Sequence, residues 1–114
     1  MTQVRTIAIE ADGDGEFHYS RHFVGVILGV KVSQGTLGGF DLTMADSDQS
    51  LTILDDVGIS GDAWFQPLII GQNVDGTPVA SLGGHVPPCV IGTLAIDATG
   101  CDADGKGYIR LVLA

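Results

Sequence analysis

Basic residues are scarce in this 114-residue chain: five stand against fourteen acidic ones, and the formal net charge is −9. They are spread along the sequence, at Arg5, Arg21, Lys31, Lys106 and Arg110. A protein that binds the nucleic-acid backbone needs clustered Lys and Arg to neutralise phosphates. Nucleic acid is therefore not an expected partner. The acidity is typical of a solvated exterior and also suits a positively charged partner surface.

Long apolar runs are also absent. The longest, residues 23–32, contains two glycines and a lysine, whereas a membrane-spanning helix needs about 20 apolar residues. The first residues lack the basic and apolar regions of a secretory signal. We expect a protein that is made in the cytoplasm and does not bind a membrane.

The chain has only two cysteines, Cys89 and Cys101. The residues between them are typical of a strand, whose ends lie roughly 20 Å apart, whereas the Cα atoms of a disulfide lie about 5.5 Å apart. Two free thiols are therefore expected. The cysteines lack the Cys-x-x-Cys spacing of zinc sites, and on a strand His18 and His22 would lie roughly 13 Å apart. No metal site is predicted from these residues.

Signatures of catalysis are missing as well. The sequence has no Gly-x-Ser-x-Gly elbow, and its glycine-rich residues 35–39 are not followed by the Lys-Ser/Thr pair of a phosphate-binding loop. Neither cysteine lies in the context of a known nucleophile. We expect a protein that is not an enzyme and that uses no cofactor.

What the sequence does contain is a period of two and seventeen glycines, which together indicate strands and tight turns. Strands are predicted at residues 4–10, 16–20, 24–32, 40–44, 50–54, 90–97 and 107–113. Asp/Gly-rich turns follow at residues 12–15, 55–58 and 98–106, the first and last of them as hairpin turns. The predicted fold is all-β: a single-domain, antiparallel, jelly-roll-like β-sandwich of about seven to eight strands that spans residues 1–114.

The strand at residues 24–32 has an unusual second face. Alternation places Val24, Val26, Leu28, Val30 and Val32 on one face and two glycines, Ile27 and Lys31 on the other. We expect the valine face to lie in the core. The nearly bare second face would allow another element or subunit to approach closely, or the glycines would let the strand bend.

Two regions are predicted to form interfaces. Residues 60–88 form a long excursion with the only tryptophan, and loops of this length are often functional; Trp64, Phe65 and Pro67 are its expected anchors. Trp64 and Phe65 should point to opposite faces if they lie on a strand. The first strand, with Ile7 and Ile9, is the second region, as an edge that pairs with a neighbour.

Two acidic turns, residues 12–16 and 102–105, leave a second interpretation open. Both place carboxylates two residues apart before a glycine, as calcium loops do. The full calcium-loop pattern is absent, and Asp and Gly are the ordinary residues of turns, so simple turns are favoured. The alternative function is a ligand-binding β-sandwich for sugar or calcium.

Six features follow one another along the chain: an Arg/Thr-containing first strand (residues 4–9), the Gly/Asp turn, the long apolar strand, Phe40-Asp41-Leu42-Thr43, Trp64-Phe65-Gln66-Pro67, and a last strand that ends in Tyr108-Ile109-Arg110-Leu111-Val112. In this order the chain resembles small virion structural proteins of tailed bacteriophages, of the capsid decoration or cement type. It departs from them in the mid-chain loop, which is nearly uncharged here and more basic and aromatic there.

The resemblance implies a β domain on the capsid surface of a virion, made in the host cytoplasm and acting without turnover. Its partners would be the major capsid protein and copies of itself, as a homo-oligomer on the capsid. A tail or connector component of the phage is the alternative within the same resemblance.

Overall fold

The structure is a computed structural model that describes residues 3–70 and 85–114. Eleven strands form in these residues: β1 Gln3–Glu10, β2 Phe17–His22, β3 Gly25–Ser33, β4 Phe40–Asp46, β5 Leu51–Ile59, β6 Ala63–Phe65, β7 Ile69–Ile70, β8 His85–Val86, β9 Cys89–Val90, β10 Thr93–Thr99 and β11 Lys106–Leu113. The described residues contain no helix that is long and apolar enough to cross a membrane.

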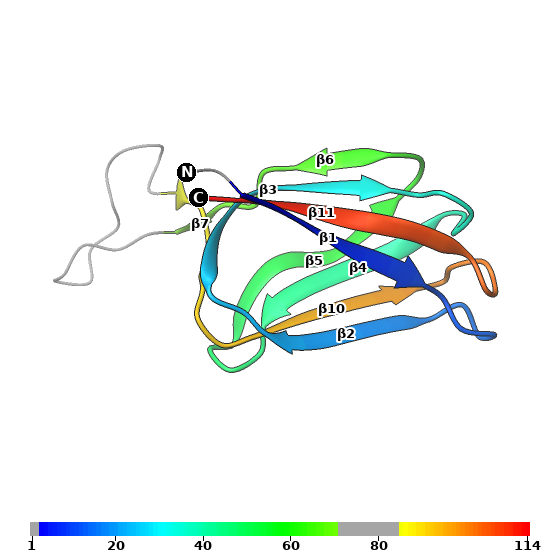
Figure 1. The fold of residues 1–114 in the computed structure, drawn as a ribbon, viewed down its shortest axis with the longest axis horizontal. Coiled ribbons are helices and arrows are strands. Elements are labelled where there is room, and N and C mark those ends of the chain that lie inside the picture. The colour runs from blue at the N-terminus through cyan, green and yellow to red at the C-terminus, as the bar shows by residue number, and fades with distance from the viewer. Residues whose placement is uncertain (1–2, 71–84) are drawn as a thin grey trace, which may run out of the picture.

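Nine of the strands form two antiparallel sheets that pack face to face (Figure 1), and β7 and β8 pair with each other as a separate two-stranded sheet. Sheet A has the order β1-β11-β3-β6, and β9 also pairs with β3; sheet B has the order β2-β10-β4-β5. Without the two-residue strands β7, β8 and β9, the remaining eight follow the strand order of a jelly roll. The predicted all-β, jelly-roll-like sandwich is therefore confirmed.

Alternation along the strands builds the core between the sheets. On β10, Leu94, Ile96 and Ala98 are fully buried, and the residues between them face outward. The same period governs β4, β11 and the second half of β1. Because each inward residue meets the opposite sheet, a period of two in the sequence becomes a two-layer fold.

Strand β3 contradicts the prediction of a single valine face. Ile27, Val30 and Val32 are fully buried, whereas Leu28 is 37% exposed. The register with β11 shifts at this point, since Leu113 pairs with Ile27 while Val112 pairs with Gly29. Leu28 is therefore the extra residue of a β-bulge, which exchanges the inner and outer faces of the strand.

Both predicted hairpins at the acidic turns are wrong. β1 lies in sheet A and β2 in sheet B, and the turn at residues 98–106 likewise joins β10 of sheet B to β11 of sheet A. These two loops are hydrogen-bonded to each other instead. The amide of Ala11 donates to the carbonyl of Gly105 at 2.9 Å, and the amide of Cys101 donates to the carbonyl of Gly15 at 3.0 Å. A turn sequence specifies a reversal, but it does not specify which strand the returning chain will pair with.

Two predicted strand ends are also wrong. β5 continues through the predicted turn at residues 55–58, because Asp56 adopts a φ of 48° and forms a bulge in place of a turn. The predicted strand at residues 90–97 is divided at Ile91-Gly92, where the amide of Ile91 donates to Asp46 at 3.2 Å. A buried carboxylate from β4 thus separates β9 from β10.

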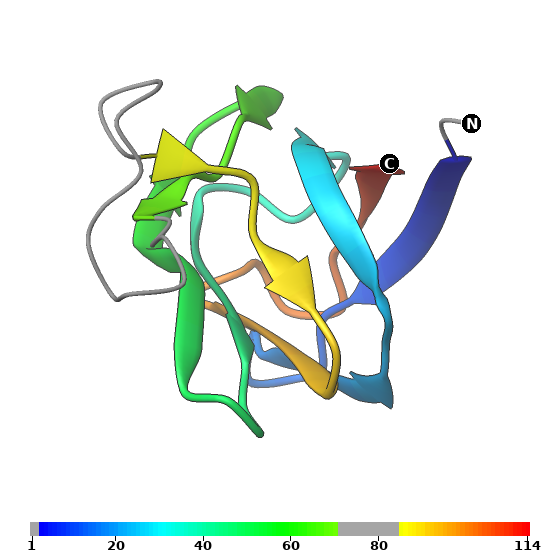
Figure 2. The same cartoon turned by 90° about the vertical axis from the view of Figure 1, so that its left-hand side faces the viewer.

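The two ends of the sandwich differ. β1 begins and β11 ends at one end, which we call the terminal end, and the loops after β1, β3, β5 and β10 lie at the other, the loop end (Figure 1). Viewed from the terminal end, β9 lies beside the start of β3 (Figure 2).

Candidate interaction surface

Trp64 lies on the outer face of sheet A. β6 pairs with β3 so that Trp64 is opposite Lys31 and Phe65 is opposite the buried Val30. Phe65 consequently packs against the core, and Trp64 points outward and is 53% exposed. The two aromatic residues thus lie on opposite faces, as alternation predicts.

The indole of Trp64 covers Gly29. A Cβ atom at Gly29 would overlap the six-membered ring of Trp64, so the ring can lie flat on the strand only because residue 29 has no side chain. The close approach expected at the bare face of β3 is therefore made by β6 of the same chain.

Exposed apolar side chains continue from Trp64 toward the terminal end. Val4 pairs with Val112, which in turn pairs with Gly29, so these residues form one row across the sheet. The β3–β9 ladder also places Val24 opposite Ile91, between the Gly25–Val90 pair and the hydrogen bond from Phe23 to Gly92. We call the exposed members of this region the apolar patch: Val4, Val24, Leu28, Trp64 and Ile91.

Charge is divided between the outer faces of the two sheets. On sheet A, Arg110 pairs with Lys31 next to the apolar patch, and Lys106 pairs with Glu10 at the loop end. On sheet B the outward positions of β4 and β10 hold Asp41 and Asp97, and Asp55 and Asp56 are exposed in the bulge of β5. Among the described strands of sheet B, no outward position holds Lys or Arg.

A groove of about 530 Å³ lies between the edge strands β1 and β2. Its lining includes Arg5, Arg21 and the half-buried rings of Phe17 and Tyr19, and no acidic residue of the described chain lines it. The Arg5 guanidinium lies 4.9 Å from the centre of the Phe23 ring, a cation–π contact that holds it at the groove.

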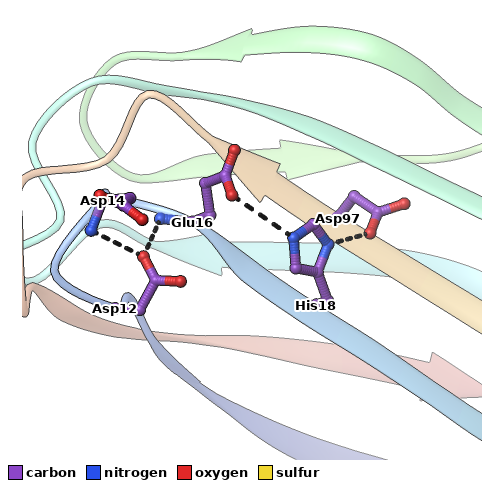
Figure 3. A network of polar contacts seen from close by, with 5 residues as sticks. All are labelled: Asp12, Asp14, Glu16, His18 and Asp97. Atoms are coloured by element: carbon purple, nitrogen blue, oxygen red, sulfur yellow. Dashed lines mark hydrogen bonds and ion pairs between the residues drawn. The ribbon is translucent and has the colours of Figure 1, made fainter.

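One exposed polar network joins β2 to β10 (Figure 3). His18 Nδ1 lies 2.6 Å from an oxygen of Asp97, and His18 Nε2 lies 3.8 Å from Glu16. The hydrogen bond with Asp97 raises the pKa of His18, because it favours the charged imidazolium. Among the described residues, the polar contacts of the ring are those with Asp97 and Glu16, which form a surface ion-pair network.

At the acidic loop end, Asp12 accepts hydrogen bonds from its own turn. Asp12 accepts hydrogen bonds from the amides of Asp14, at 2.9 Å, and Glu16, at 3.0 Å (Figure 3). The bond from Glu16 contributes most to the lowered pKa of Asp12. Asp12 therefore stabilises its own turn, and residues 3–70 and 85–114 contain no group of three side chains placed to bind a metal ion.

The two cysteines lie apart, with β10 between them, and they are not bonded. Cys89 is exposed on β9, and Cys101 is half-buried in the β10–β11 loop. Burial raises the pKa of the Cys101 thiol, so this thiol is the less reactive of the two in the folded protein.

Three of the five predicted interface side chains are not available to a partner. Ile7 and Ile9 are 6% and 0% exposed because they point into the core, and Pro67 is buried as well. The first strand is nevertheless an edge of sheet A, as expected. Part of the predicted excursion, residues 71–84, lies outside the described residues.

Sequence reasoning missed most of the apolar patch. Val4 and Ile91 were assigned to strands without regard to which face they would occupy, Val24 and Leu28 were expected in the core, and Arg110 was regarded only as a scattered charge. The alternation of Val4 with the buried Ile7 and Ile9 was a usable signal. For Leu28 the sequence contains no such signal, because the exposure of this residue depends on the β-bulge in β3.

No protein-family model matches the chain, and neither a curated protein nor a solved structure is significantly similar to it.

Proposed function

We propose that this protein is a bacteriophage virion structural protein, of the capsid decoration or cement type, that binds the outer capsid shell through the outer face of sheet A. The observation that carries the proposal is the division of the surface. The outer face of sheet A holds the apolar patch together with Lys31, which lies opposite Trp64, and Arg110, which lies opposite Lys31, whereas the acidic side chains gather on sheet B and at the loop end.

Such a division suits a protein that binds by one face. Exposed apolar side chains in a contiguous patch are typical of interaction sites, and Trp and Arg are enriched among residues that dominate binding energy. The acidic sheet B would remain in solvent and keep the bound particle soluble. The jelly roll also occurs in viral capsid domains, which is an analogy of fold and not of site.

A ligand-binding sandwich is the second candidate, and the groove between β1 and β2 favours it. Two arginines and two aromatic rings line this groove, a combination that suits an anionic or sugar-like ligand. For calcium, the loop end provides no group of ligands in the described residues.

The test is co-sedimentation of the protein with capsid shells of the phage or prophage that carries this gene, isolated without the protein. We expect saturable binding, and we expect Trp64→Ala together with Lys31→Glu to weaken it at least tenfold. Both side chains are exposed, so the variant should fold.

The matched control is Asp41→Asn, which changes charge on the outer face of sheet B. It should bind like the original protein. The proposal fails if the shells do not retain the protein at micromolar concentration. If Asp41→Asn weakens binding and the sheet A variant does not, then the protein does not bind the shell through the outer face of sheet A.

A further inference from the structure

The two sheets expose four edges to solvent, and these edges differ in how they are protected. An unpaired edge strand presents a row of free N–H and C=O groups, which other strands can bind. Natural proteins prevent this with short strands, bulges, or charges placed on the edge.

Three of the four edges are shorter or less regular than the fourth, β1. On one side of β3, β6 has three residues and β9 has two. β5 changes register twice and exposes Asp55 and Asp56 at the irregularity. β2 carries the charge of Arg21 at an inward position, opposite the buried Leu94.

β1 is long and regular, and its one inward charge, Arg5, lies near its start. Its eight residues pair with eight consecutive residues of β11 without a register shift. Residues 6–9 contain no charge and no proline, and the outward side chains among them are the small Thr6 and Ala8. The only charges in the strand that flank this stretch are Arg5 and Glu10, which have opposite signs.

We propose that β1 pairs with β1 of a second copy of this chain, antiparallel and about a two-fold axis, so that two copies of sheet A become one continuous sheet. Identical edges can form a closed dimer only in this way. The pairing does not depend on a capsid and goes beyond the function proposed above.

The charges in β1 favour a second copy in the antiparallel orientation. Centring the pair on Ile7 places Thr6 opposite the partner's Ala8 on the outer face and Arg5 opposite the partner's Ile9 on the inner face. Each end of the paired strands then holds one Arg5 and one Glu10, on opposite faces of the sheet, so that no two like charges share an end. Parallel pairing would instead bring like charges together at both ends.

The inner side of β1 also favours this arrangement. Ile7 points inward and lines the groove, where the rings of Phe17 and Tyr19 are only half-buried. A second copy placed along β1 would cover this side of both molecules, which removes further apolar surface from water.

The test is the mass of the purified protein in solution, measured by light scattering across a range of concentrations. We expect a species of twice the 11.8 kDa of the chain. The double variant Thr6→Lys/Ala8→Lys should run as a monomer, because lysines on an edge strand oppose pairing. Both side chains are exposed, so the fold should survive, as circular dichroism would show.

The matched control is Thr52→Lys/Thr99→Lys, which adds the same charge at exposed positions of sheet B and should remain a dimer. Hydrogen exchange gives a second readout: all amides of residues 6–9 should be protected in the original protein, and alternate ones should exchange fast in the β1 variant. A protein that is monomeric at all concentrations, or a dimer that survives Thr6→Lys/Ala8→Lys, would overturn the proposal. Neither result bears on shell binding, which the sheet A variant tests separately.

Discussion

Gly15, in the β1–β2 loop, has no room for a side chain. Its φ is 77°, and a Cβ atom there would overlap the carbonyl oxygen of Cys101 in the neighbouring loop. Gly15→Ala should therefore lower the free energy of unfolding by at least about 2 kcal/mol, from the strained backbone and the displaced loop.

Gly13 is the control for this prediction, since it lies in the same loop and a Cβ atom there would meet nothing within 4 Å. Gly13→Ala should change the free energy of unfolding by no more than about 0.5 kcal/mol. Urea denaturation measures both variants. Equal effects would mean that the loops do not approach each other as the structure places them.

The pair of His18 and Asp97 predicts a pH dependence. Because the pKa of His18 is raised in the folded protein, the pair stabilises the fold fully below the unfolded pKa of about 6.5, and the contribution is lost as the pH rises through the folded pKa. Asp97→Asn should lower the pKa of His18 in an NMR titration. It should also reduce the melting temperature more at pH 5 than at pH 8.

Glu16→Gln provides the comparison, since Glu16 lies farther from the ring, at 3.8 Å. It should lower the pKa of His18 less than Asp97→Asn does. A titration in which both variants match the original protein would show that the side-chain contact of Figure 3 does not form in solution.

At the scale of elements, Asp46 connects the β4–β5 turn to the start of β10. It is fully buried, and its carboxylate accepts hydrogen bonds from the amide of Asp48 at 3.2 Å, from the Gln49 side chain at 2.6 Å and from the amide of Ile91 at 3.2 Å. Asp46→Ala would remove three part-buried hydrogen bonds to a charged acceptor and leave its buried site empty, so we expect it to reduce the free energy of unfolding by about 3 kcal/mol.

Asp48→Ala is the matched control, since Asp48 is exposed and accepts one side-chain bond, from Thr93 at 2.9 Å. Its effect should stay below about 1 kcal/mol. Thermal or urea denaturation measures the free energy of unfolding of both variants. A larger effect for Asp48→Ala would show that Asp46 does not connect the β4–β5 turn to the start of β10.

The same elements show why the predicted strand boundaries failed. Residues 90–97 form an apolar, β-branched run whose one sign of a break is Gly92, and a glycine within a strand does not by itself say whether the strand ends there. The break depends on Asp46, which is 45 residues away in the sequence. The bulge in β3 similarly depends on its register with Val112 and Leu113.

For the whole molecule, the excess of acidic residues should make stability depend on salt. Much of the net charge of −9 lies at the loop end and on sheet B, where like charges repel each other in the folded state. Sodium chloride should raise the melting temperature by screening this repulsion.

Calcium should act no differently from magnesium at equal concentration, because the described carboxylates do not converge on one ion. Thermal melting with each salt measures the effect, with calorimetry for binding. A shift in melting temperature, with heat of binding, for calcium alone would contradict this and revive the calcium alternative.

The candidate surface could be predicted only in part. Trp64 was identified from its rarity and its position beside Phe65, and the alternation of β6 did place it outside. Ile7, Ile9 and Pro67 were chosen for their apolar character, which is equally a property of core residues. The apolar character of a residue does not by itself distinguish a core residue from an exposed residue that binds a partner.

The sequence by itself determined the fold class, because alternation within each strand specifies an inner and an outer face without reference to any distant residue. It also determined the reversals at residues 12–15 and 98–106, because Asp and Gly favour turn conformations such as those at Asp12 and Gly15, although β5 continues through the third predicted turn. Only the tertiary structure decided which sheet each strand joins, where β3 bulges, and which edge stays long and regular. Each of these depends on the packing of strands that are far apart in the chain.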